Sequence, residues 1–157
     1  RQSEKDDLSC LPVLQLSDVS PEITPTVLEH FKIGNTPVQS TVQPTNGVTY
    51  FRTVLSASHL PPEMKRMLPL FCEVATKMGT LDKHYRVQSQ EAELKTGGLD
   101  ASVHLVDHPS NPGSFEQGVL LSSHCLESNT ESMFSLWKDI FLRLSMEDEE
   151  RLSQLIQ

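Results

Sequence analysis

The segment LDASVHLV, at residues 99–106, has the most regular pattern in this chain. Its apolar residues alternate with polar ones at Asp100, Ser102 and His104. Alternation with a period of two predicts a β-strand that packs one face on a core and leaves the other face wetter. A loop rich in Pro, Ser, Asn and Gly at 108–114 leads to a second alternating run at 115–124, so we expect the two runs to pair antiparallel.

Helical patterns precede this strand pair. After Pro62, apolar residues recur at steps of three and four as far as Met78, and Pro69 should separate a short first turn from a main helix over 69–78. A second helix is expected over 82–96, because Gly97-Gly98 can end it and reverse the chain.

Two further helices are expected after the strand pair. Ser128 and Glu131 have the spacing of a capping box in front of an apolar stripe that runs to Leu144. Ser145 and Asp148 repeat that spacing before a last, short amphipathic helix.

A further pair of strands is expected nearer the N-terminus. Residues 38–43 alternate, Asn46-Gly47 is a strong turn signal, and 48–57 is rich in β-formers. We therefore predict a hairpin of 38–43 with 48–57, its second strand buried on both faces. The resulting element order, β-β-α-α-β-β-α-α, predicts an α+β fold with helices layered on a largely antiparallel sheet.

Residues 1–37 differ from the rest in being polar at the start and interrupted by four prolines. No long helix can run through such a segment, so we interpret 1–37 as an interdomain linker or strap and 38–157 as an incomplete α+β domain. The chain begins without Met and stops inside an amphipathic pattern, which we interpret as the mark of a piece of a longer protein.

Composition narrows the classes of partner. The net charge is -8 and no apolar run approaches the roughly 18 residues of a membrane span, so we expect neither a nucleic-acid nor a membrane surface. Six basic residues between 65 and 95 are interleaved with five acidic ones. This pattern is typical of a solvated face, with a basic docking patch as the alternative.

One cluster imitates a metal site. His104, Asp107 and His108 follow the inverted zinc-peptidase spacing H-x-x-E-H with Asp in place of Glu, which raises the alternative of a small autonomous zinc hydrolase. That motif requires a helix, whereas residues four apart in a strand lie roughly 13 Å from each other. The strand pattern therefore argues against local zinc binding.

Three cysteines at wide spacings do not form a disulfide framework. Cys72 and Cys125 lie in apolar patterns and are expected in the core. Cys10 lies in the polar connector and is a possible redox thiol, although a plain exposed thiol is the simpler interpretation.

Several short motifs occur together in one order, and they resemble the mitochondrial branch of the pitrilysin-type zinc metallopeptidases. They are 37–39 (PVQ), 43–52 (QPTNGVTYFR), 68–72 (LPLFC), 93–98 (ELKTGG) and 116–120 (EQGVL). The resemblance implies a pitrilysin/LuxS-like α+β repeat, the third of four, at the start of the noncatalytic second half. It also implies a clamshell enzyme of the mitochondrial matrix that hydrolyses cleaved presequences and other short unstructured peptides.

The same resemblance implies that zinc is bound outside this chain, in a catalytic N-terminal half that would be its partner. The helix here that matches the zinc-binding helix, 62–78, contains no His, so no catalytic residue and no metal ligand is carried over. The chain would form part of the wall and closure of a peptide chamber. The alternative is a pitrilysin-like domain that is catalytically silent and serves assembly. Missing repeat elements predict exposed apolar surface on the isolated chain.

Overall fold

The computed structural model describes residues 14–20, 22 and 25–156, and the chain divides into two compact units between Gln43 and Pro44. The first unit contains a short 3-10 helix, η2 (Leu16–Asp18), and a two-stranded antiparallel sheet of β1 (Glu29–Ile33) and β2 (Thr36–Ser40). Gly34 makes the tight turn between these strands with a φ of 60°, a conformation that glycine adopts without strain.

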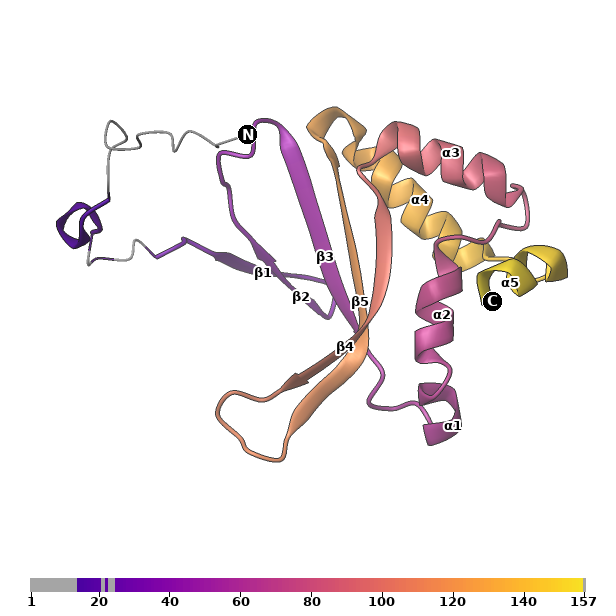
Figure 1. Ribbon diagram of the computed structural model, residues 1–157, viewed down its shortest axis with the longest axis horizontal. Helices are drawn as coiled ribbons and strands as arrows, with labels where there is room; N and C mark the ends of the chain where they lie inside the picture. The colour runs from indigo at the N-terminus through magenta and orange to yellow at the C-terminus, as the bar shows by residue number, and fades with distance from the viewer. Residues whose placement is uncertain (1–13, 21, 23–24, 157) are drawn as a thin grey trace, which may run out of the picture. The chain divides into compact units, whose positions relative to one another are not determined.

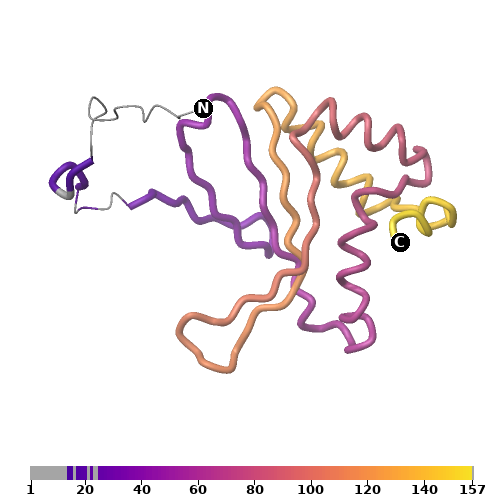
Figure 2. The backbone as a smooth tube through the Cα atoms, viewed as in Figure 1, coloured from indigo at the N-terminus to yellow at the C-terminus, as the bar shows by residue number. Residues whose placement is uncertain are grey.

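The second unit carries the remaining elements, coloured from magenta to yellow in Figures 1 and 2. In chain order they are β3 (Val48–Ser56), α1 (Pro62–Lys65), α2 (Leu68–Ala75), α3 (Tyr85–Lys95), β4 (Leu99–Asp107), β5 (Phe115–Leu126), η3 (Glu127–Asn129), α4 (Thr130–Arg143) and α5 (Glu149–Ile156). The sheet order is β3-β5-β4 and both pairs are antiparallel. The helices lie on one side of this sheet (Figure 1). The predicted α+β class, with helices layered on an antiparallel sheet, is confirmed.

The predicted hairpin of 38–43 with 48–57 is wrong. The Asn46-Gly47 turn does form, with positive φ at both residues, but β3 pairs with β5 along its whole length, from Val48 opposite Leu126 to Ser56 opposite Gly118. The strand before the turn, β2, pairs instead with β1. The sequence prediction missed Gly34-Asn35, a second two-residue turn signal inside the expected strap, and a local turn alone does not fix which strand pairs with which.

The core of the second unit lies between the sheet and the helices α2 and α4. Met133 and Trp137 of α4 are buried against Leu121 and Cys125 of β5 and Cys72 of α2. The indole Nε1 of Trp137 donates a buried hydrogen bond of 2.9 Å to Ser123 Oγ, so its polar edge is satisfied inside the core. The expectation that Cys72 and Cys125 belong to the core is confirmed.

Helix starts differ in detail from the predicted capping boxes. Neither Ser128 nor Asn129 caps α4 with its side chain; instead the hydroxyl of Thr130 donates to the carbonyl of Glu127. At α5 the capping acceptor is the Asp148 carboxylate, which takes the Arg151 amide at 2.9 Å. The 3-10 turn η3 tightens the entry to α4 and removes the geometry that a Ser128 box requires.

The helical predictions hold with shifted ends. Pro69 does separate two helices, α1 and α2, but α2 ends at Ala75 and not at Met78. β3 is only partly buried, since Tyr50 is exposed, so the prediction that both of its faces are covered is wrong. Among the described residues, no helix is long and apolar enough to cross a membrane.

Candidate functional site

The sheet of the second unit has one face without helices, which we call the polar face. Residues that pair across neighbouring strands share a face, so the register assigns this face directly. It carries Tyr50 and Arg52 from β3, Glu116, Ser122 and His124 from β5, and Asp100, Ser102 and His104 from β4. Aromatic, hydroxyl, cationic and anionic groups are therefore presented together on one surface.

An aromatic pair stands at one end of the polar face. Tyr50 and His124 lie opposite each other in the register, and their rings stack with centroids 5.5 Å apart at 19°. The imidazole also lies against Gly97, where a Cβ would be 2.0 Å from His124 Nε2. Because only glycine leaves room for the ring there, Gly97 positions His124 as well as turning the chain into β4.

A second contact lies further along the polar face. His104 Nε2 is 3.6 Å from Glu116 Oε2. Asp107 is an odd number of positions from His104 and lies on the opposite face of β4, while His108 lies beyond the strand end and accepts the Ser110 amide at Nδ1. These residues do not fit a zinc site, because three ligands of one ion must converge on one point.

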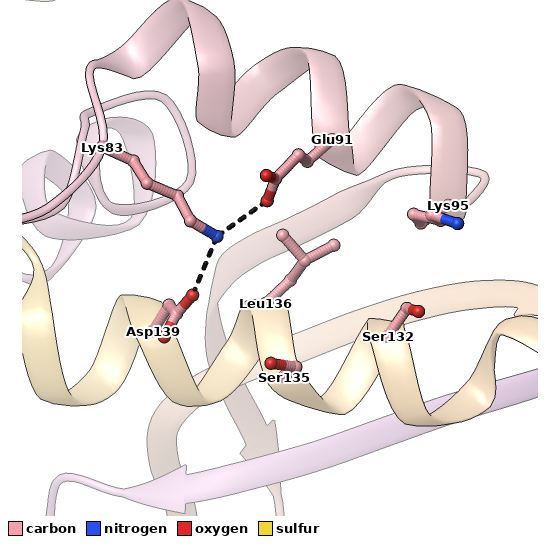
Figure 3. A pocket seen from close by; sticks show the side chains of 7 residues that line it. All are labelled: Lys83, Glu91, Lys95, Ser132, Ser135, Leu136 and Asp139. Atoms are coloured by element: carbon pink, nitrogen blue, oxygen red, sulfur yellow. Dashed lines mark hydrogen bonds and ion pairs between the residues drawn. The ribbon is translucent and has the colours of Figure 1, made fainter.

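A charged cavity of about 280 Å³ lies between α3 and α4 (Figure 3). Lys83 extends into it, with its Nζ 2.7 Å from Glu91 Oε2 and 3.2 Å from Asp139 Oδ2. Lys95, Ser132, Ser135 and Leu136 complete the lining. The two carboxylates come from different helices, so one ammonium ties α3 to α4.

The electrostatics of this cavity follow from the ion pairs. The hydrogen bond to Glu91 is the main cause that raises the pKa of Lys83 above 10.5, Asp139 adds to it, and partial burial opposes both. Lys83 was expected on a solvated face, and that interpretation is wrong. Asp139 is 56 positions away, so nothing in the local pattern indicated the pair.

The cysteines offer no reactive thiol among the described residues. Burial is the main cause that raises the pKa of the Cys72 thiol, and the negative charge of Asp100 adds to it, so the group stays protonated at neutral pH. Cys125 is buried as well. Cys10, the possible redox thiol, lies outside the described residues.

Taken together, the geometry suits contact more than bond cleavage. In the part of the chain that the structure describes, no three His, Cys, Asp or Glu side chains are grouped so that they could hold a metal ion. The polar face can stack on, hydrogen-bond to and attract a ligand, and the Lys83 cavity joins two helices. Sequence alternation predicted which residues of β4 and β5 share this face, but it missed Tyr50 because β3 was assigned to the wrong partner strand.

Comparison with known proteins gives the class. The family model described as associated with peptidases of family M16, subfamily C, matches residues 1–157, the whole chain. The chain is 46% identical over 156 residues to the protein named "Presequence protease, mitochondrial" of Xenopus laevis, and 43% identical over 158 residues to the protein of that name in Mus musculus. The protein of that name in Drosophila melanogaster is 32% identical over 157 residues.

The chain belongs to this peptidase-associated family. This confirms the resemblance to the pitrilysin-type metallopeptidases that the short motifs indicated. Each of these three matches covers 99% or more of the chain and 15% of the length of the relative.

Proposed function

We propose that the chain is a noncatalytic part of a mitochondrial zinc metalloendopeptidase that degrades cleaved presequences and other short unstructured peptides. The observation that carries this is the match of nearly the whole chain, at 46% identity, to 15% of a protein named for that activity. The matrix is the proposed compartment. Zinc would be bound by the catalytic half of the same protein, because the residues described in this chain do not fit a metal site.

The organisation follows the same proposal. Residues 1–37 act as the linker between the two halves, and 38–157 form the start of the third repeat. In that arrangement the polar face forms part of the chamber wall, and closure of the two halves positions the peptide and excludes water. A noncatalytic wall then acts on turnover through peptide binding and the open-to-closed equilibrium.

Charge on the polar face supports a basic peptide as the ligand. Asp100 and Glu116 are exposed carboxylates on this face, Arg52 is the one permanent cation in the set defined above, and the whole chain has a net charge of -8. Presequences are basic and amphipathic, so a wall with this charge attracts them at long range.

The test is made in the full-length parent enzyme with the double variant Asp100→Asn, Glu116→Gln. We expect KM for a basic presequence peptide to rise roughly two- to tenfold at low salt with kcat unchanged, since two exposed attractive charges are lost. The effect should shrink at high salt. The matched control is Glu93→Gln, an exposed carboxylate on α3. An unchanged KM, or an equal change in the control, contradicts the chamber-wall role.

A catalytically silent assembly domain is the second candidate, and exposed apolar residues on the β4–β5 hairpin favour it, because assembly surfaces are apolar at their centre. The two functions differ in the parent protein. One zinc per chain after dialysis, together with cleavage of a presequence peptide, supports the peptidase. A parent that holds no zinc and cleaves nothing supports the assembly domain.

A further inference from the structure

An apolar groove of about 370 Å³ lies on the helical side of the sheet, where β3 ends and α1 and α2 begin. Val119 forms part of its floor and Phe71 part of its wall. Met64 and Met67, one turn apart, lie at the groove and are 54% and 55% exposed. Two half-exposed methionines beside an aromatic ring provide an adaptable apolar surface of the kind that accepts another apolar segment.

The groove continues onto the β4–β5 hairpin. Val103 pairs with Val119, so it lies next to the groove on the same face of the sheet, and Leu105 follows two positions further along. Phe115 pairs with Asp107 and lies on that face too. Leu105 and Phe115 are 64% and 58% exposed. We call Leu55, Met64, Met67, Val103, Leu105 and Phe115 the apolar surface.

The chemistry of this surface separates the candidate occupants. The residues that line the groove include neither a carboxylate nor a cationic side chain, so the groove offers nothing that pairs with the charges of a basic peptide. A contiguous apolar surface with no charged group at its centre is typical of permanent interfaces, whereas transient ones are more polar. The polar face, on the other side of the sheet, carries the charged groups instead.

We propose that the apolar surface is an intramolecular interface, covered in the whole protein by polypeptide of the same parent chain that lies outside residues 1–157. The lengths support this occupant: the chain covers 15% of the matched relatives, so most of a homologous parent lies outside it. A covering segment of the parent chain is present at a high effective concentration, which a second copy or a free peptide is not.

Methionine oxidation in the full-length parent tests whether the surface is covered. For each methionine, the rate of sulfoxide formation with dilute peroxide is compared between the native and the denatured protein by mass spectrometry. Met78 and Met133, both buried, give the limit for full protection. We expect Met64 and Met67 to be protected at least tenfold, close to that limit. Protection of only about twofold, which half-exposed side chains would show, overturns the proposal.

Photo-crosslinking identifies the occupant. A photoreactive benzoylphenylalanine replaces Met64 in the full-length parent, and the control replaces Leu94, an exposed residue of α3 that does not line the groove. We expect the Met64 position to crosslink within one chain to a peptide from outside residues 1–157, and the Leu94 position not to do so. A crosslink between two chains, a crosslink to an added presequence peptide, or none at all counts against the proposal. Cleavage activity is not read out, so failure here leaves the proposed function untouched.

Discussion

The two ends of β5 have the same alternating pattern and different surroundings. Toward the C-terminal end, the residues on the helical side, Leu121, Ser123 and Cys125, are buried beneath the helices. Toward the N-terminal end, Phe115 lies on the same side and is exposed, as is Leu105 on β4. A period of two therefore fixes which face a side chain is on, but not whether anything covers that face.

Element lengths explain the difference. A 12-residue strand such as β5 is roughly 40 Å long, whereas the 14-residue helix α4 is only about 21 Å long. The helices cover the end of the hairpin that carries the core, and the other end extends beyond them (Figure 1). The expectation of exposed apolar surface is confirmed, and it is concentrated where the helical layer stops.

The largest effect separates the covered end from the uncovered end. Met133→Ala removes a side chain with 0% exposure and should lower the free energy of unfolding by about 2–5 kcal/mol. Leu105→Ala on the hairpin should change it by less than about 0.5 kcal/mol, because that side chain is largely exposed already. Urea denaturation of the 157-residue chain, followed by tryptophan fluorescence, measures both. Equal effects in the two variants would refute the comparison.

The next effect concerns a polar group inside the covered end. Ser123→Ala removes the acceptor of the Trp137 indole and leaves a buried N–H unpaired, so we expect a loss of about 1–3 kcal/mol in the free energy of unfolding. Ser122→Ala is the matched control, since Ser122 is the neighbouring residue and lies on the polar face. If the control loses as much as Ser123→Ala, strand propensity is the cause and not the hydrogen bond.

The parts of the fold that could be predicted are those in which pattern and partner are neighbours in the sequence. The β4–β5 pair is of this kind, because a short loop joins two alternating runs, and so is the division of α1 from α2 at Pro69. The pairing of β3 with β5 was missed, since about 60 residues separate the strands and the Asn46-Gly47 turn suggested a nearer partner.

The candidate site was predictable to a smaller extent for the same reason. The strand pattern around His104 correctly argued that His104, Asp107 and His108 do not converge on one ion. The stack of Tyr50 on His124 and the contact of Lys83 with Asp139 join residues that are 74 and 56 positions apart. No local period encodes such contacts, because they depend on which elements the fold brings together.

The smallest predicted effect concerns the ion pair that ties α3 to α4. Lys83→Met should lower the free energy of unfolding by about 0.3–1 kcal/mol, because the group is partly exposed to water. A double-mutant cycle with Asp139→Asn isolates the contact, and Lys77→Met, which breaks an exposed pair with Glu73 at the end of α2, is the control. A coupling no larger than in a Lys77 and Glu73 cycle would mean that the link between helices adds nothing beyond a surface pair.

The pH dependence of that coupling gives an independent test. The pKa of Lys83 is raised in the folded state, so its contribution is fully present below about 10.5, the usual value in an unfolded chain, and decreases as the pH rises through the higher folded-state value. The coupling between Lys83 and Asp139 should therefore stay constant from about pH 7 to about pH 10 and fall only above 10.5. A coupling that already falls between about pH 7 and pH 9 would have to come from another group, and the assignment of the link to the Lys83 ammonium would then be wrong.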